Sequence, residues 1–355
     1  MKIAVLGFAH GHVNSYCVRW RDDPGMDIQV VKGWDHDQTR LTAAAQAYGL
    51  TPCADVAGIL ADQDIKAVVI AAETARHAEL AVAAADAGKA IVIQKPMALT
   101  MTQADQIVAA VNRNRVPCTV AWQMRVDPQN LYVKDMLAQG RLGQIFQFRR
   151  RHGLGVCLNH EFAKSWHVSS SMNRDIWADD AAHPIDLIYW LFGLPESVTA
   201  EIESLFDPDM PNDNGIAIFR YPGGPLVEVH CSFVSVGAET TMEIWGDKGF
   251  LTQSYGDAVS AAMPRDPQAV GMKYYLRAEK AWTDCGIPSP NAQGVRIAGL
   301  AQPLADFLHG RRPPIATAEE GRDVLRMVLA TYVSNDQGRR VTLDDPAIQA
   351  YPPPN

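Results

Sequence analysis

Three side chains that could carry out hydride transfer on an alcohol lie far apart in this chain of 355 residues. Lys95 follows the apolar run 90–93 and precedes Pro96, while Asp179 and His183 come much later, four residues apart. That spacing suits one face of a helix. An imidazole can exchange a hydroxyl proton near neutral pH, and an ammonium group can stabilise a developing alkoxide. If they meet beside a dinucleotide, the three have the chemistry that a sugar or polyol dehydrogenase needs.

Each of these residues also has a structural interpretation. Lys95 could be a solvated lysine at a strand end, and His183 a buried core histidine. Because Pro184 cannot donate a backbone hydrogen bond, we expect the helix that carries Leu187 to begin near Pro184, with Asp179 just outside it. The spacing of four would then hold only approximately. Asp180 provides a second carboxylate next to Asp179.

Composition limits the classes of function. The chain is 47% hydrophobic and 20% charged, with a formal net charge of −8. A phosphate backbone or an anionic membrane would on balance repel such a protein, so we expect neither nucleic acid nor a membrane as partner. No apolar run reaches the length of a membrane span, and the chain starts directly with a strand, which predicts a cytoplasmic protein. Six scattered cysteines without a CxxC pair indicate reduced thiols.

Residues 1–122 alternate short β-rich runs with alanine-rich helical patterns, which predicts a doubly wound parallel sheet of the Rossmann type. The two helical runs 42–49 and 77–88 each end on a glycine, a common helix stop. The predicted strands lie near residues 2–6, 28–34, 66–72, 89–94 and 117–122.

Residues 123–355 differ because strands follow one another from about position 145. Pro222-Gly223-Gly224 between two of them predicts a hairpin turn. The predicted strands are 145–151, 197–205, 215–221, 226–234 and 240–245. The fold class is therefore α/β, with a second α/β domain built on an open, mostly antiparallel sheet.

The hexapeptide 7–12 lies where a dinucleotide-binding turn is expected, between a first strand and a first helix. It departs from G-x-G-x-x-G, because Ala9 and His12 replace the second and third glycines and only Gly7 is retained. A glycine turn of any α/β protein explains this stretch equally well. Asp35 ends the second strand, where a carboxylate accepts hydrogen bonds from a ribose and repels a 2′-phosphate, which favours NAD over NADP. Asp35 could instead cap the next helix, and Arg40 leaves NADP possible.

Taken together, these stretches resemble the Gfo/Idh/MocA family, which includes glucose-fructose oxidoreductase and inositol dehydrogenase. The resemblance spans nearly the whole chain, and it implies an N-terminal Rossmann domain, a substrate domain and a homodimer or homotetramer formed through the exposed face of the second sheet. The matching stretches are the N-terminal turn, 71–77, 94–100, 125–128, Trp166, 179–193, 244–249 and the late helix with 334–338.

The resemblance also implies roles for single residues. Lys95 corresponds to the lysine of the family's Glu-Lys-Pro motif, which lies between nicotinamide and substrate; Gln94 replaces the glutamate. Arg125 could also be an interdomain ion-pair partner. The implied catalytic residues are Lys95, His183 and Asp179; the cofactor-binding residues are Gly7, Phe8, Ala9, His10, Asp35, Ala72, Glu73, His77, Gln94 and Lys95; the substrate-binding residues are Gln123, Arg125, Trp166, Asp179 and His183.

His160, Glu161 and His167, with Asp179 and His183, could in principle bind a divalent ion. No short ligand spacing supports this, and hydride transfer to NAD needs no metal, so we expect none. The sequence thus predicts an NAD(P)-dependent dehydrogenase acting on a secondary hydroxyl of a sugar, inositol or related polyol. Two alternatives stay open: a lyase, epimerase or glycosidase that retains its NAD and oxidises transiently, or a sugar-sensing regulator without turnover.

Overall fold

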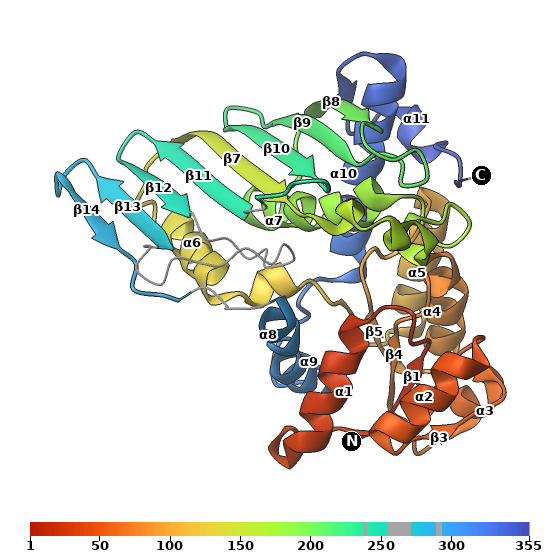
Figure 1. Ribbon diagram of the computed structural model, residues 1–355. Helices are drawn as coiled ribbons and strands as arrows, with labels where there is room; N and C mark the ends of the chain where they lie inside the picture. The colour runs from red at the N-terminus through yellow and green to blue at the C-terminus, as the bar shows by residue number, and fades with distance from the viewer. Residues whose placement is uncertain (238–239, 254–270, 289–292, 355) are drawn as a thin grey trace.

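The computed structural model describes residues 1–237, 240–253, 271–288 and 293–354, which form two lobes (Figure 1). The N-terminal lobe contains a parallel six-stranded sheet in the order β3-β2-β1-β4-β5-β6, which confirms the predicted Rossmann topology. The two-residue β3 was not predicted, because so short a run has no period of its own. The strands are β1 (Lys2–Leu6), β2 (Gln29–Trp34), β3 (Thr51–Pro52), β4 (Ala67–Ile70), β5 (Ala90–Ile93) and β6 (Cys118–Val120).

The helices of this lobe begin and end at the residues that favour such ends. Asp37 caps α2 and Thr100 caps α5, each by accepting backbone N–H bonds from the first turn. Gly49 and Gly88 follow α2 and α4 with positive φ, as the sequence predicted. The helices are α1 (His12–Asp22), α2 (Gln38–Tyr48), α3 (Val56–Ala61), α4 (His77–Asp86) and α5 (Met101–Asn114).

The second lobe is built on a nine-stranded sheet in the order β14-β13-β12-β11-β7-β10-β9-β8-β15. Among the described strands of this sheet only β7 and β10 pair in parallel, so the prediction of a mostly antiparallel sheet is confirmed, as is the hairpin between β9 and β10. Four outer strands, β12 to β15, were not predicted. The strands are β7 (Ile145–Gly153), β8 (Ser197–Glu203), β9 (Asn214–Arg220), β10 (Leu226–Ser232), β11 (Thr240–Gly246), β12 (Gly249–Gln253), β13 (Met272–Leu276), β14 (Ala281–Asp284) and β15 (Val341–Thr342).

Helices cover one face of this sheet and leave the other open (Figure 1). On the covered side, α7 (Ala182–Phe192) packs against β10 and the long α10 (Ala318–Gln337) packs against β8. Helix α6 (Pro128–Ala138) lies on the same side in Figure 1, and the short α11 (Pro346–Gln349) packs against α10 and α5. The alternation of buried and exposed residues along β9 and β10 follows from the one-sided cover.

The chain returns to the first lobe near its C-terminal end. Helices α8 (Gln293–Ala298) and α9 (Ala301–Leu308) pack against α1, and the indole of Trp20 donates to the carbonyl of Ala301 at 3.0 Å. In Figure 1 both helices lie beside α1. The predicted domain boundary between residues 122 and 123 therefore stays a prediction, because α8 and α9 from the later segment pack against the Rossmann lobe.

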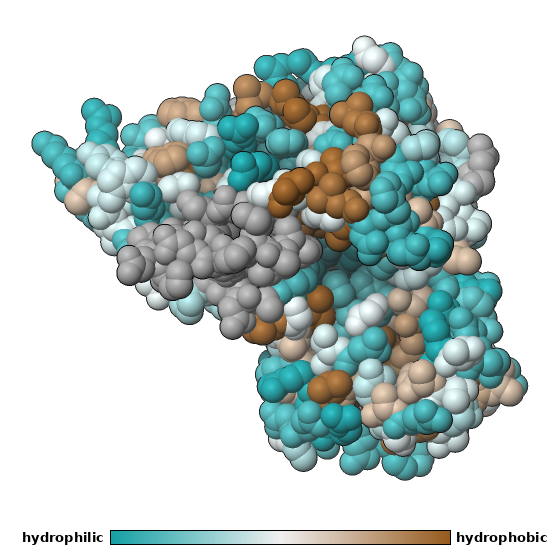
Figure 2. All heavy atoms as spheres, in the orientation of Figure 1, coloured by the Kyte–Doolittle hydropathy of each residue, from teal (hydrophilic) through white to brown (hydrophobic). Residues whose placement is uncertain are grey.

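The surface is hollowed where the two lobes meet, and a waist separates them in Figure 2. Across this junction the backbone N–H of Val120 donates to Ala316 and that of Ala75 donates to Met172, each at 2.9 Å. Within the described ranges, no helix has both the length and the apolar character needed to cross a bilayer.

Gly7 shapes the turn between β1 and α1. Its φ is +88°, and a Cβ built on it would lie 2.3 Å from the Cα of Ala72. Its backbone N–H donates to the carbonyl of Trp34 at 2.7 Å, which fixes the turn between the neighbouring strands. This position therefore requires glycine for both conformation and space.

Replacing Gly7 with Ala should lower the free energy of unfolding by about 2 to 4 kcal/mol, since the side chain meets backbone atoms and φ is unfavourable. Urea unfolding measures this change. Gly11→Ala serves as control, because nothing lies within 4 Å of a Cβ built there. Equal stability of the two variants would contradict the assignment.

Candidate active site

A cavity of about 240 Å³ opens between the lobes, and ionisable side chains crowd its wall. Lys95 reaches it from the end of β5, whereas Asp179 and Asp180 come from the segment before α7. The structure thus brings together the three residues Lys95, Asp179 and His183 that the sequence singled out. Five histidines line the same cavity: His10, His12, His152, His167 and His183.

Lys95 and Asp179 form a buried ion pair between the lobes. The ammonium donates to Oδ1 of Asp179 at 3.0 Å and to its backbone carbonyl at 3.2 Å; the side chains are 3% and 2% exposed. The other oxygen of Asp179 lies 2.7 Å from Nδ1 of His167. Although burial alone would raise the pKa of Asp179, the charges of Lys95 and His167 hold it below its usual range. Asp179 is therefore an ionised link between the lysine and His167.

A π-helical turn decides which way Asp179 faces. Trp177–Ala181 form this turn, and α7 follows directly at Ala182, two residues before the predicted start at Pro184. A π turn holds an extra residue, so the spacing of four does not bring Asp179 onto the imidazole of His183. Asp180 takes that place instead, with Oδ1 at 3.6 Å from Nε2 of His183.

His183 is a buried, neutral imidazole. Burial lowers its pKa well below 6.5, and the nearby charges of Lys95 and Arg296 lower it further. Nε2 lies 3.4 Å from the amide nitrogen of Gln123, which also lines the cavity. Nδ1 has no hydrogen-bond partner within the part of the chain that the structure describes. Because the amide nitrogen of Gln123 donates, Nε2 is the acceptor atom of the neutral ring and Nδ1 carries its proton; Nε2 is therefore the atom that can take up a proton.

The pKa of Asp180 is raised above that of an ordinary carboxyl group. Burial raises its pKa from 3.8 to about 6, and the negative charge of Asp179 adds to the rise against the opposing effect of Lys95. Its side chain is 18% exposed, so it lies between the buried His183 and solvent. This position and pKa suit a group that passes protons out of the cavity.

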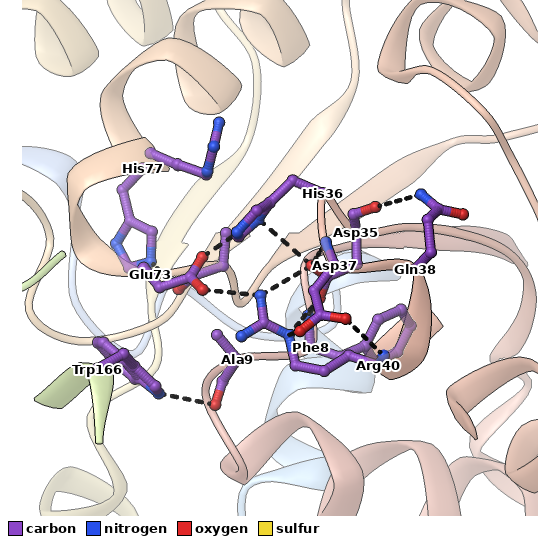
Figure 3. Close-up of polar contacts among 12 residues, drawn as sticks. Phe8, Ala9, Asp35, His36, Asp37, Gln38, Arg40, Glu73, His77 and Trp166 are labelled. Atoms are coloured by element: carbon purple, nitrogen blue, oxygen red, sulfur yellow. Dashed lines mark hydrogen bonds and ion pairs between the residues drawn. The ribbon is translucent and has the colours of Figure 1, made fainter. Parts of the chain in front are cut away.

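The residues of the predicted cofactor turn gather at the other wall of the cavity. His10 is 1% exposed, and neither of its ring nitrogens has a partner among the described residues. Burial lowers its pKa well below 6.5, and it lowers the pKa of His12 to about 3. The indole of Trp166 donates to the carbonyl of Ala9 at 3.0 Å (Figure 3). Trp166 thus supports the turn, while its neighbour His167 lines the cavity.

Two predicted cofactor residues bind protein groups instead of facing the cavity. The amide nitrogen of Gln94 donates to the hydroxyl of Tyr16 in α1 at 2.9 Å. His77 is fully buried, and its ring nitrogens lie 2.9 Å from the carbonyl of Pro96 and 3.0 Å from that of Ala72. His77 therefore joins the segments that follow β4 and β5. The peptide bond between Lys95 and Pro96 is cis.

Asp35 is engaged by the protein on both oxygens (Figure 3). It accepts from the backbone N–H of Phe8 at 2.7 Å and from the guanidinium of Arg40 at 2.8 and 3.1 Å. Arg40 also donates to Glu73 at 2.7 Å. The cap of α2 is Asp37, so the alternative role of Asp35 as a helix cap is wrong. Arg40 thus lies between two carboxylates, Asp35 and Glu73.

Arg125 is not among the residues that line this cavity, and its substrate-binding role stays a prediction. Its guanidinium binds Asp186 at 2.7 Å and Glu320 at 2.7 Å, and all three residues belong to the second lobe. It therefore joins the segment after β6 to α7 and α10, as an ion pair within one lobe instead of between two. Among the residues considered as metal ligands, His160 binds Asp207 and Glu161 binds Lys164, away from the cavity.

Residues at the carboxyl ends of β1, β4 and β5 fit a dinucleotide. Gly7 lets the first turn lie against Ala72 where a side chain would collide. The two buried ring nitrogens of His10 have no hydrogen-bond partner among the described residues, whereas Oε2 of Glu73 lies 3.5 Å from Nδ1 of His36. Rossmann folds bind coenzyme at this edge of the sheet, with the pyrophosphate at the N-terminus of the first helix.

Comparison with known proteins decides the family. An oxidoreductase family with an NAD-binding Rossmann fold matches residues 1–122, and the GFO/IDH/MocA C-terminal domain matches residues 130–252. The chain belongs to the Gfo/Idh/MocA family. This Gfo/Idh/MocA protein is 28% identical to D-apiose dehydrogenase of Paraburkholderia graminis, over 96% of this chain and 89% of that protein. It is also 28% identical to inositol 2-dehydrogenase 2 of Saccharopolyspora erythraea, over 81% and 85% of the two chains.

A solved structure shares the whole fold of this family member. Levoglucosan dehydrogenase in complex with NADH and levoglucosan superposes with a TM-score of 0.80 at 21% identity, covering 97% of this chain and 100% of the other. At this identity the likeness concerns the fold. Both lobes and the junction between them are therefore shared with an NADH-binding enzyme.

Among the ionisable residues that line the cavity, sequence reasoning missed His152 and Arg296. His167 was considered only as a metal ligand, although its place beside Trp166 was a matched position. His152 faces inward because side chains alternate along β7, a signal that the strand pattern contained. Arg296 comes from α8, a short helix with no recognisable motif.

Replacing Asp180 with Asn should make the protein more stable at high pH. Because its pKa is higher in the folded than in the unfolded chain, ionising Asp180 opposes folding. This loss of stability is absent below pH 4 and complete above about pH 6. The free energy of unfolding of the variant, relative to the natural chain, should rise by roughly 1–2 kcal/mol between pH 4 and pH 8. Urea unfolding across this range measures it. Asp86→Asn is the control, because Arg113 lowers that carboxyl pKa and no gain is expected; a difference for Asp180→Asn that does not change with pH would refute the assignment.

Proposed function

We propose that this protein is a dehydrogenase that moves a hydride between NAD and a secondary hydroxyl of a sugar, inositol or related polyol. The observation that carries the proposal is the meeting of Lys95, Asp179 and His183 on one cavity beside the Rossmann turn. The curated relatives named apiose and inositol dehydrogenases support the substrate class. Bound NAD supplies the hydride acceptor at its nicotinamide ring.

Lys95 polarises the reacting oxygen. An ammonium group has three N–H donors, and two of these are held by the side chain and backbone of Asp179. The third is left for the substrate oxygen, on which negative charge develops during oxidation. Asp179 thus fixes the direction of the lysine, and His167 fixes Asp179 from the other side.

His183 accepts the hydroxyl proton. Its depressed pKa keeps the ring neutral at physiological pH, so the base is ready before the substrate arrives. Asp180, 3.6 Å away with a pKa of about 6, accepts the proton in turn and releases it toward solvent. Reduction of a ketone uses the same groups in reverse.

NAD is the preferred coenzyme in this proposal. Asp35 and Glu73 form an acidic pair at the end of β2 and after β4, where a 2′-phosphate would meet negative charge. Arg40, the residue that could bind such a phosphate, is already engaged by both carboxylates. NADP could bind only if Arg40 turned away from them.

The protein also has features of a cytoplasmic homodimer or homotetramer. All six cysteines are unpaired, which suits a reducing compartment. The open face of the second sheet exposes Ile216, Ile218, Leu226 and Trp282, each between 44% and 51%. Apolar side chains gathered on one sheet face support an interface between copies, and sedimentation analysis tests it: a monomer at micromolar concentration would exclude this part of the proposal.

A screen of polyols and aldoses with NAD and NADP, followed at the absorption band of reduced nicotinamide, tests the activity. We expect net NADH formation with at least one compound and less with NADP. Lys95→Ala should lower kcat by at least about 100-fold while NADH binding, followed by fluorescence, persists. Lys66→Ala, which removes an exposed lysine of the same lobe, is the control. Unchanged turnover in Lys95→Ala, or product without net NADH, would exclude this mechanism.

His167 is a positioning residue in the same scheme. Replacing it with Phe removes the 2.7 Å contact to Asp179 and should lower kcat/KM by about 10- to 100-fold, the value of a charge-assisted hydrogen bond. His167→Asn keeps a donor near Nδ1 and should retain most of the activity. Steady-state kinetics over pH 5 to 9 compare the two. Equal losses of kcat/KM in both variants would show that the contact between His167 and Asp179 does not support catalysis.

A further inference from the structure

Arg296 lines the cavity, and one of its charged N–H donors has no partner within the part of the chain that the structure describes. Its Nε donates to Asp127 at 3.1 Å and its Nη1 donates to Gln293 at 2.8 Å. Nη2 is buried and has no hydrogen-bond partner among residues 1–237, 240–253, 271–288 and 293–354. The residue is 4% exposed, and an unpaired buried donor costs about 1–3 kcal/mol, more when charged. A group outside the described protein would satisfy it.

This donor lies close to the site of proton transfer. Arg296 and Lys95 line one cavity with His183, and both charges lower the pKa of His183 and of His152 after the larger effect of burial. His152 is 3% exposed, and its two ring nitrogens have no partner in the described ranges. The side of the cavity near Arg296 therefore offers a cation and a neutral imidazole together.

We propose that the substrate carries a carboxylate, which accepts a hydrogen bond from Nη2 of Arg296 while a hydroxyl of the same molecule lies at Lys95 and His183. The inference rests on the proposed function and narrows its substrate to a hydroxy acid of monosaccharide size, such as an aldonate or a uronate. The small volume of the cavity, about 240 Å³, suits one such molecule. Hydroxyl groups next to the carboxylate can bond to His152, which both donates and accepts.

A purely structural role does not account for the geometry. The ion pair with Asp127 uses only Nε, and Asp127 also caps α6 by accepting from the backbone of Gln129 and Asn130. A structural arginine would be expected to spend all its donors on such groups. The guanidinium fork allows one side chain to hold Asp127, Gln293 and an incoming carboxylate at once.

Binding to the NADH-loaded protein tests the proposal, because the reduced coenzyme offers no hydride acceptor for a hydroxyl. Isothermal titration compares D-gluconate with D-glucitol, D-glucuronate with D-glucose, and D-glucose 6-phosphate as a second anion. At least one acid should bind about 10-fold or more tightly than its neutral partner. Arg296→Gln should bring that ratio to within about 2-fold, and Arg296→Lys should keep part of it.

Controls separate charge loss from misfolding. Arg113→Gln removes a surface cation that pairs with Asp86 and should leave the ratio unchanged. If Arg296→Gln does not fold, as judged by circular dichroism, the double variant Arg296→Gln with Asp127→Asn removes both buried charges and replaces it.

Equal binding of acids and neutral partners, a preference retained in the glutamine variant, or a preference for the phosphate ester alone would overturn the proposal. An acid preference that depends on Arg296, without NADH formation from any compound, would keep this subsite and reject the dehydrogenase. Oxidation of neutral polyols without a preference for acids would support the dehydrogenase and reject the carboxylate subsite.

Discussion

The ion pair between Lys95 and Asp179 is the constraint on which the site depends, because it joins two lobes that have separate sheets. Taking both charges out of water costs several kcal/mol per ion, and only close contact and further hydrogen bonds offset that cost. Asp179 obtains them from both Lys95 and His167, and Lys95 from two oxygens of Asp179. The end of β5 is thereby fixed against the segment before α7.

Around this pair the site consists largely of neutral imidazoles. Burial is the main cause that lowers the pKa values of His10, His152 and His183, and the positive charges nearby act in the same direction. A neutral histidine both donates and accepts, which suits hydroxyl groups better than a charged one does. The cavity thus combines the charges of Lys95, Asp179 and Arg296 with neutral histidines that can both donate to and accept from a polyhydroxylated molecule.

The sequence predicted the parallel sheet and the central strands of the second sheet well, because hydrophobic periodicity and glycines at helix ends are local signals. Sequence analysis did not predict β12 to β15. These strands lie toward the two edges of the second sheet, and their order depends on contacts between residues distant in sequence. Spacing and family resemblance identified Lys95 and His183 as candidate catalytic residues. The contact of Asp179 with His167, and of Asp180 with His183, could not be foreseen, because a π turn leaves no mark on the residue pattern. The ion-pair role left open for Arg125 was foreseen only in kind, because motif position does not reveal that Asp186 and Glu320 are its partners.

The return of α8 and α9 to the first lobe has a consequence for modularity. The indole of Trp20 in α1 finds its acceptor at Ala301, so the nucleotide-binding half is completed by a late piece of chain. Cut out at residue 122, that half would leave a tryptophan donor without its acceptor and bare the apolar side of α1. The coenzyme-binding lobe therefore depends on two distant parts of the chain and is not a module that residues 1–122 form alone.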